Sequence, residues 1–331
     1  MSLPDAATER IAMAYYYIWY TKGWFDGSSI PQFRATMSDV HPMLGSYDSS
    51  DPDVIAAHID QCKLAKLDAL AVSWWKGKNN ASWLRSDSHH QGANQDDILE
   101  TVMTTGYERG IRSTIILEAY TDDAELIYDA LKYYIERYCN DPRALHAQGR
   151  PVVCSWNTWN LGLEVWNGII GRLREEGLDA FHIATNQPET SFFECFDAID
   201  IYTPLSVTDT AMETYTGLRA EVDAYNLTDA GKAKPGRWHA TIMPGFEDRM
   251  MVDRLSRDDY AHFRYRHGGD YYWETFAAAM ASQPEWLHVT SFNELAEHSH
   301  IEDTLEYGSR YLDLTARFVG EYKAAAQIRK S

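Results

Sequence analysis

The chain alternates between short apolar runs and longer amphipathic stretches. Eight runs rich in β-branched and aromatic residues have the length and composition of buried strands. They lie at 11–20, 67–75, 111–120, 150–157, 179–187, 198–205, 236–245 and 286–293. Helical spacing of apolar positions follows at 51–65, 95–109, 122–138, 161–176, 209–225, 270–283 and 308–325, whereas 189–196 has room for one or two turns. This alternation indicates a parallel sheet covered by helices.

The number of strand–helix units sets the expected architecture. Eight units indicate a closed (β/α)₈ barrel of the TIM type more than an open, doubly wound sheet. No linker rich in Pro, Gly or Ser divides the 331 residues, and no internal repeat is visible. We therefore expect an α/β protein with a single barrel domain over residues 1–331.

The expected strands share a feature at their carboxyl ends, where polar and aromatic side chains gather. These are Tyr17, Trp19, Tyr20, Trp74, Trp75, Glu118, Tyr120, Trp156, Asn157, Asn186, Tyr202, Asn293 and Glu294. For any one of them, the alternative is a strand that simply meets solvent. In a barrel, however, these ends converge on one face, which is the face that carries active sites. Their agreement along the chain predicts a functional site there.

Composition and charge narrow the class of ligand. The chain has 11 Trp and 21 Tyr, an excess that fits either ordinary core packing or a sugar-binding cleft lined by flat rings. The net charge of −19 argues against nucleic acid or an anionic membrane as a partner. No Walker or Rossmann phosphate loop and no apolar run of membrane-spanning length is present. We expect a carbohydrate ligand and no cofactor, and the sequence leaves partner proteins unknown.

Cysteine usage and the N-terminus bear on the compartment. Cys62, Cys139, Cys154 and Cys195 are widely spaced, without a CxxC pair, and we expect them to be buried free thiols. Residues 1–10 lack the basic and apolar segments of a signal peptide. The expectation is therefore a cytoplasmic protein, or a secreted or periplasmic one if the N-terminus has been trimmed.

The candidate catalytic groups follow the last expected strand. That strand delivers Asn293 and Glu294 to the barrel mouth, and Glu297 comes three residues later. On a helical turn, residues three apart face the same way, with roughly 5–6 Å between Cβ atoms. Two carboxyls so placed raise each other's proton affinity, so that one serves as acid and the other as base. Glycoside hydrolysis needs such a pair, although two Glu at this spacing are also common on solvated helices.

The same segment also allows a metal hypothesis. His298, His300 and Glu302 lie close together, but their spacing matches neither the HExxH pattern nor an EF-hand loop, and exposed loop histidines are the alternative. A serine nucleophile is not supported, since no G-x-S-x-G motif occurs. We expect no metal.

Ordered motifs along nearly the whole chain resemble those of glycoside hydrolase family 99, the endo-α-1,2-mannosidases and mannanases. Residues 14–20 resemble the family's YYPWY strand, 41–52 its HPxLGxYxSxDP loop, and 72–75 its SWW strand end. Residues 117–120 are similar to HIEPY, 149–152 to the G-[KR]-P strand, 244–249 to PGYxxxR, and 268–272 to GxYY. Residues 290–302 resemble TSFNEWHEGTQIE.

The resemblance implies a (β/α)₈ barrel that hydrolyses an α-linked glycan with retention of configuration. By position, Glu294 would deprotonate the sugar's 2-hydroxyl to give a 1,2-anhydro intermediate, and Glu297 would act as general acid and then base. The residues implied for substrate binding are Tyr16, Trp19, Trp74, Trp75, Glu118, Tyr120, Tyr202, Arg249 and Asn293.

Three departures accompany this resemblance. Leu295 and Ala296 stand where the family has Trp-His, the HIEPY His and Pro are absent, and 298–300 replace GTQ. Retained carboxylates with altered surroundings predict a changed substrate preference, because specificity depends on such contacts. A catalytically silent glycan-binding barrel and a metal-dependent hydrolase using His298 and His300 are the two alternatives.

Overall fold

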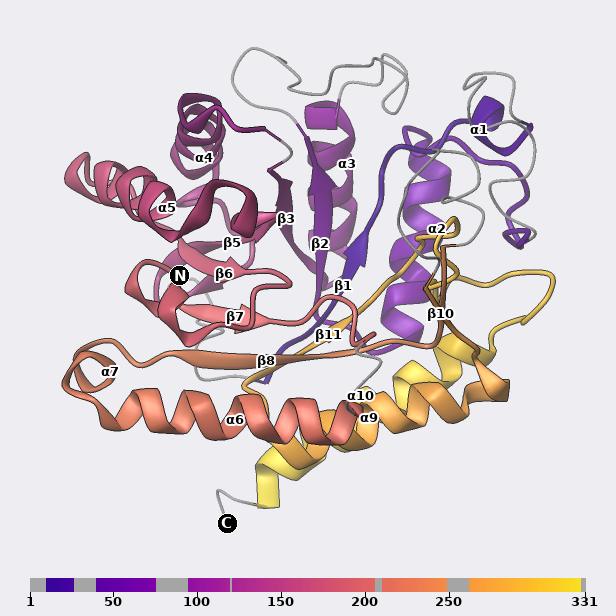
Figure 1. Ribbon diagram of the computed structural model, residues 1–331. Coiled ribbons are helices and arrows are strands. Elements are labelled where there is room, and N and C mark those ends of the chain that lie inside the picture. The colour runs from indigo at the N-terminus through magenta and orange to yellow at the C-terminus, as the bar shows by residue number, and fades with distance from the viewer. Residues whose placement is uncertain are drawn as a thin grey trace.

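A computed structural model describes residues 10–26, 40–75, 95–119, 121–205, 210–248 and 262–328. Its centre is a ring of eight parallel strands (Figure 1). These are β1 (Ala12–Tyr16), β2 (Ala69–Trp74), β3 (Arg112–Glu118), β5 (Arg150–Trp156), β6 (Phe181–Ala184), β7 (Ala198–Asp200), β8 (Arg237–Ile242) and β11 (Trp286–Val289). Each strand pairs with the next, β11 pairs with β1, and β3 pairs directly with β5. The sheet is therefore closed, and the predicted (β/α)₈ barrel is confirmed.

Helices surround this ring (Figure 1). They are α2 (Pro52–Leu64), α3 (Gln95–Glu108), α4 (Ala124–Tyr138), α5 (Thr158–Glu175), α6 (Ala211–Leu227), α9 (Asp270–Ser282) and α10 (Arg310–Ile328), with the shorter α1 (Lys22–Asp26) and α7 (Asp229–Ala233). A 3₁₀ turn, Thr190–Glu194, fills the short interval between β6 and β7, and another, His267–Gly269, precedes α9. Two small antiparallel additions are β4 (His146–Ala147), beside β5, and the pair β9 (Phe246–Glu247) and β10 (Phe263–Arg264).

Local sequence accounts for where several helices begin. Asp51 caps α2 by accepting a hydrogen bond from the Asp53 amide, and Pro52 occupies the first turn, where its missing N–H costs nothing. Thr210 and Glu213 form a reciprocal capping box at the start of α6. These caps accept hydrogen bonds from amides that would otherwise lack a partner at the start of a helix. Each of these helices therefore begins at a defined residue.

The strands are shorter than the apolar runs that predicted them. β1 ends at Tyr16, although the apolar run continues to residue 20, and β7 contains only Ala198–Asp200 of the expected 198–205. The residues that extend beyond the hydrogen-bonded ladder are largely aromatic and buried, among them Tyr17, Tyr20 and Tyr202. They fill the mouth of the barrel rather than lengthening its strands.

Alternation along each strand produces two separate cores. In β1, Ala12, Ala14 and Tyr16 pack into the layer between strands and helices. Met13 and Tyr15 pack into the barrel interior, which Tyr17 continues at the mouth. The same period of two places Ile115 and Leu117 of β3 outside and Ile116 inside. A side chain at the end of a strand can therefore reach the mouth only when it occupies a position that points into the barrel.

Polar groups also occupy the barrel interior. The Tyr15 hydroxyl donates to Asp200 Oδ2 at 2.8 Å, and His288 Nδ1 lies 3.0 Å from the same oxygen. The four cysteines are free thiols, as expected, although Cys139 is only half-buried. Within the described ranges, no helix combines the length and apolar character needed to cross a membrane.

Candidate active site

The segment that follows β11 crosses the barrel mouth and is held by two hydrogen bonds between the Asn293 side-chain amide and the backbone of Tyr17. The Tyr17 backbone N–H donates to Asn293 Oδ1 at 2.8 Å, and Asn293 Nδ2 donates to the Tyr17 carbonyl at 2.9 Å. One residue earlier, the Phe292 amide donates to the Tyr15 carbonyl at 2.8 Å. The Asn293 side chain thus continues the pairing of β1 with β11 beyond the strand ends. This fixes the position of the next residue, Glu294.

Two further groups hold the backbone around Glu294. The Glu294 amide donates to Ser291 Oγ at 2.8 Å, and Ser291 is bonded in turn to Ser299. The Tyr20 hydroxyl donates to the Asn293 carbonyl at 2.6 Å and accepts from the Leu295 amide at 3.2 Å. Residues 295–298 form a single turn, with the His298 amide bonded to the Leu295 carbonyl. As expected for a three-residue spacing on a turn, Glu297 comes back toward Glu294.

The carboxyl of Glu294 lies in a buried, negatively charged environment. Its side chain is 4% exposed. Burial raises its pKa well above the usual value, and the charge of Glu297 and then that of Glu118 raise it further. Carboxylates that interact this strongly cannot all ionise at neutral pH, so the group as a whole retains a proton. This is the electrostatic condition for an acid and a base in one site.

Glu118, the last residue of β3, is the third member of this carboxyl cluster. Burial raises its pKa to about 8, the hydrogen bond from Ser73 opposes this shift, and the charge of Glu297 adds to it. Ser73 Oγ donates to Glu118 Oε1 at 2.9 Å and accepts from Trp75 Nε1 at 3.0 Å. A relay from the tryptophan through the serine therefore orients the Glu118 carboxyl.

Two phenols lie beside the carboxyls. The hydroxyls of Tyr17 and Tyr202 form a short hydrogen bond with each other. Burial raises the pKa of Tyr202, and the charges of Glu297 and Glu294 raise it further. Both phenols therefore remain protonated near neutral pH and can donate hydrogen bonds at the mouth.

Aromatic rings flank the phenol pair on both sides. Tyr17 packs against Trp19, with 4.6 Å between ring centroids, and Trp19 lies 6.3 Å from Trp75. On the other side, Tyr202 packs against Trp156 at 4.8 Å. Apolar rings beside hydrogen-bonding groups are the combination that binds a sugar, whose ring faces are apolar and whose edges are polar.

A buried arginine holds the far end of the segment 291–300 that carries Glu294 and Glu297. Arg266 donates to the carbonyls of His298 and His300, both at 2.8 Å, and its guanidinium lies over the rings of Tyr307 and Tyr311. Burial lowers the pKa of Arg266. The β9–β10 pair ends just before this residue and adds a second restraint, because the Glu247 amide of β9 donates to the Glu297 carbonyl at 2.8 Å.

This geometry agrees with the result of the family comparison. The sequence model of glycosyl hydrolase family 99 matches residues 31–324, which is most of the chain. The chain belongs to glycosyl hydrolase family 99. It is therefore a glycoside hydrolase, and the alternative of a catalytically silent barrel is set aside.

Individual relatives agree with this assignment. The chain is 23% identical over 363 residues to a glycoprotein endo-α-1,2-mannosidase of Rattus norvegicus, covering 93% of this chain and 74% of that protein. It is 24% identical over 329 residues to the enzyme of the same name from Mus musculus, covering 87% and 67%. A solved family 99 endo-α-mannosidase from Bacteroides thetaiotaomicron has a TM-score of 0.77 at 20% identity, covering 96% of this chain and 98% of that one. This last likeness establishes the fold.

The structure brings together most of the residues that the sequence pointed to. Glu294, Glu297, Glu118 and Tyr202 share one electrostatic environment at the mouth, and Trp19 and Trp75 stand at its edge. Asn293 lies beneath them, but both polar ends of its side chain are engaged by Tyr17. These bonds give Asn293 a role in holding the backbone, and its expected contact with substrate stays a prediction.

Two residues expected at the mouth lie elsewhere. Tyr16 faces the helical layer, where its hydroxyl contacts His58 Nδ1 at 2.9 Å. Trp74 is fully buried in the same layer, with Nε1 donating to Asp96 and its ring stacked on Tyr133. Both side chains point outward from their strands, toward the helices, so the prediction that they line a cleft is wrong. Tyr120 and Arg249 lie outside the described residues.

Tyr17 was expected at a strand end but not among the substrate-binding residues, and Ser73 and Arg266 were not expected at the site. Parity within the strand could have found the first two, because each is one position from a residue that was chosen in its place. No local signal identifies Arg266, which meets the site only through tertiary contacts.

The residues on which the alternative metal hypothesis depended have different partners. His300 Nδ1 lies 3.2 Å from the Arg266 guanidinium, a fixed cation that would repel a metal ion. Glu302 faces the other way, toward His58 at 3.2 Å and the Tyr47 hydroxyl at 3.1 Å. Across the residues that the structure describes, no three His, Cys, Asp or Glu side chains are grouped so as to hold a metal.

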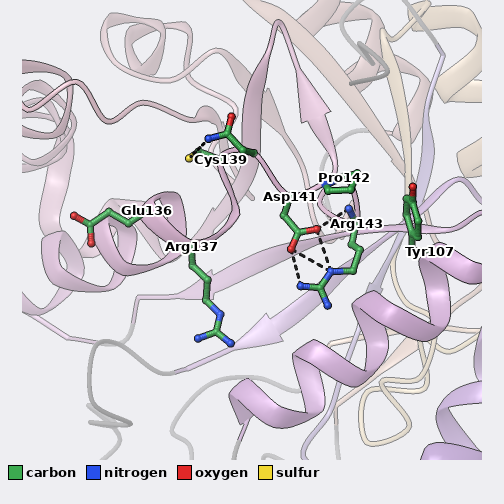
Figure 2. Close-up of a pocket in the computed structure, with 8 residues that line it drawn as sticks. Tyr107, Glu136, Arg137, Cys139, Asp141, Pro142 and Arg143 are labelled. Carbon is green, nitrogen blue, oxygen red and sulfur yellow. Dashed lines mark hydrogen bonds and ion pairs between the residues drawn. The ribbon is translucent and has the colours of Figure 1, made fainter. Parts of the chain in front are cut away.

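A cavity of about 510 Å³ lies near the amino ends of β3 and β5, the end of the barrel opposite to the carboxyl cluster. Its arginines are already paired, Arg137 with Glu100 at 2.9 Å and Arg143 with Asp141 at 2.6 Å. Figure 2 shows the Arg143 guanidinium turned toward the Asp141 carboxylate. Because its charges are satisfied internally, we assign no catalytic role to this cavity.

Proposed function

We propose that this family 99 enzyme hydrolyses internal α-linkages of mannose-like glycans with retention of configuration. The substrate class is supported by the names of the relatives, which are endo-α-1,2-mannosidases. The observation that carries the mechanism is the burial of Glu294 beside Glu297 and Glu118 at the carboxyl ends of the barrel strands. The ligand is accordingly an α-linked oligosaccharide.

In the first step, Glu294 removes the proton from the sugar's 2-hydroxyl. The 2-oxygen then attacks the anomeric carbon to form a 1,2-anhydro sugar, while Glu297 gives its proton to the departing glycosidic oxygen. In the second step, Glu297 removes a proton from water, water opens the anhydro ring at the anomeric carbon, and Glu294 returns a proton to the 2-oxygen. Each displacement inverts the anomeric carbon, so the overall result is retention.

The electrostatics support this division of roles. A sugar hydroxyl is a weak acid, so a carboxylate that removes its proton works best when its pKa is raised from the usual value toward the operating pH. Burial and neighbouring charge raise the pKa of Glu294 in that direction. Glu297 is only partly buried, which leaves it accessible to a leaving group and then to water.

The decisive experiment compares Glu294→Gln and Glu297→Gln on α-linked manno-oligosaccharides. We expect each substitution to lower kcat by about 10²- to 10⁴-fold, as is usual for loss of a general acid or base, while binding is largely kept. Glu321→Gln, at an exposed position on α10, is the matched control. Substrates whose 2-hydroxyl is replaced by hydrogen or fluorine should bind without being cleaved. Brisk cleavage of such a substrate, or full activity of Glu294→Gln, would refute the mechanism.

A further inference from the structure

Trp159 is an exposed tryptophan beside the barrel mouth. It lies in the first turn of α5 and is 46% exposed. Its indole meets that of Trp156 edge-on, with 5.3 Å between ring centroids and 79° between ring planes. A single exposed tryptophan is common on a protein surface, so what distinguishes Trp159 is its contact with a ring at the barrel mouth.

The turn that carries Trp159 is firmly held. Asn157 adopts a left-handed conformation, and its Nδ2 donates to the Ala119 carbonyl, just beyond β3, at 3.0 Å. Trp166, fully buried in α5, donates from Nε1 to the Thr158 carbonyl at 2.9 Å. The exposed ring therefore projects from a rigid base, and ordering it would cost little entropy when a ligand binds.

A continuous series of rings connects Trp159 to the carboxyl cluster. Trp156, the last residue of β5, is the register partner of Glu118. Its ring packs on Tyr202 at 4.8 Å, and Tyr202 is bonded to Tyr17. The steps from Trp159 to Trp156 and from Trp156 to Tyr202 are 5.3 Å and 4.8 Å between ring centroids. Tyr202 is buried and Trp159 is exposed, so a glycan chain bound at the cleavage site that continues toward α5 meets the Trp159 ring.

A second exposed tryptophan provides the contrast. Trp273 on α9 is also 46% exposed, but it packs against Phe276 and Phe318, and Arg317 lies over its ring. These partners belong to the outer helices α9 and α10. Trp273 is therefore part of the packing between two outer helices, whereas Trp159 belongs to the series of rings that leads to the barrel mouth.

We propose that Trp159, supported by Trp156, is a platform that binds a pyranose ring of the substrate outside the cleavage site. The ligand is a neutral, α-linked hexopyranose unit of the same oligosaccharide, held by its apolar ring face. This inference rests on the proposed function, because it assumes that a glycan chain enters at the carboxyl cluster. It adds that the enzyme recognises more than the two sugars at the cleaved bond.

The test compares Trp159→Ala with Trp273→Ala on a ladder of α-linked manno-oligosaccharides, starting at the disaccharide. We expect Trp159→Ala to raise KM for the longer substrates by about tenfold, a change typical of losing one aromatic contact, with kcat unchanged. The effect should vanish on the shortest substrate that is cleaved, and Trp273→Ala should match the wild-type enzyme throughout. Equal KM values for Trp159→Ala and wild type, or an equal loss at every length, would overturn the platform.

Failure of the proposed function would appear differently. If the wild-type enzyme cleaves no member of the ladder, the assigned activity is wrong, and binding of the same ladder is then measured by calorimetry for the wild type and both variants. A loss of affinity confined to Trp159→Ala and to the longer members would still support the platform. Identical affinities for all three proteins would refute it.

Discussion

Glu118 shows how position changes the chemistry of a single side chain. On a strand end open to water it would be an ordinary carboxylate. In the barrel mouth, burial raises its pKa to about 8, so that it is mostly protonated at neutral pH and can donate a hydrogen bond. The hydroxyl of Ser73 opposes this shift but does not cancel it. The folded protein therefore holds a proton at pH values where the unfolded chain has already released it, because the usual pKa of a glutamate is about 4.3.

This difference predicts a pH-dependent effect of Glu118→Gln. Between about pH 4.3 and the folded value of about 8, the folded state holds more protons, so the free energy of unfolding contributed by Glu118 falls as pH rises. Glutamine is neutral in both states and removes this term. Relative to wild type, the variant should gain a few kcal/mol of stability at pH 9 compared with pH 4. Urea unfolding at the two pH values measures it, and a stability difference that does not vary with pH would contradict the shifted pKa.

Arg266 affects the site through the backbone. Arg266→Met would remove the donors to the His298 and His300 carbonyls and release the segment that carries Glu297. We expect kcat to fall by about 10- to 100-fold with a much smaller change in KM, because small displacements of catalytic groups are costly. Arg266→Lys keeps one cationic donor and should recover part of the loss. Steady-state kinetics decide the matter, and a variant with lowered Tm but unchanged kcat would show that Arg266 only stabilises the fold.

At the scale of the element, the end of β2 places two successive tryptophans in opposite surroundings, with Trp74 as the last residue of the strand and Trp75 just beyond it. Trp74 packs against α4 through Tyr133 and is bonded to Asp96 of α3. Trp75 turns the other way and donates to Ser73 at the mouth. Because strand side chains alternate, these neighbours belong to different cores and have different roles.

The two faces of β2 predict opposite consequences of truncation. Trp74→Ala leaves a cavity in the helical layer and should cost about 3–5 kcal/mol of unfolding free energy, with KM unchanged in the protein that remains folded. Trp75→Ala should cost less stability and raise KM by about tenfold, because it removes a ring beside the carboxyl cluster. Denaturant unfolding and KM values for both variants test this. The parity argument fails if Trp74→Ala raises KM as much as Trp75→Ala does.

At the scale of the whole molecule, the chain carries a net charge of −19. Charge of one sign repels itself most strongly in the compact state, and the folded protein loses stability on that account. Local pairs such as Arg150 with Asp197 at 2.8 Å act in the opposite direction, but the 49 Asp and Glu outnumber the 30 Lys and Arg. Salt should therefore stabilise this protein.

The expected measure is a Tm that rises with ionic strength. Between about 0.01 M and 0.3 M sodium chloride the screening length falls from about 30 Å to well under 10 Å, which weakens long-range repulsion first. A rise of a few °C corresponds to one or two kcal/mol in a domain of this size. Thermal unfolding at several salt concentrations checks it, with a neutral osmolyte as control. A Tm that falls with salt would mean that the surface ion pairs outweigh the repulsion.

The sequence by itself determined the order of strands and helices, the closed barrel and the segment that carries the two catalytic candidates. Hydrophobic periodicity is a local property, and the eight barrel strands and seven longer helices appeared where that period placed them, whereas α1, α7, β4, β9 and β10 were not expected. Apolar composition overestimated strand length at β1 and β7, because it reports burial and not hydrogen bonding. The single-domain boundary and the compartment stay predictions, and so do the substrate-binding roles expected of residues other than Tyr16 and Trp74.

Tertiary structure alone decided which side chains meet. Tyr16 and Tyr17 are adjacent and chemically alike, yet one faces His58 in the helical layer and the other faces Tyr202 at the mouth. Their directions depend on how β1 pairs with its neighbours, which no single segment encodes. The pKa of Glu294 likewise depends on Glu118, which is 176 residues away in the chain and close only after the barrel closes. Burial and charge act through space, and the order of residues along the chain does not contain those distances.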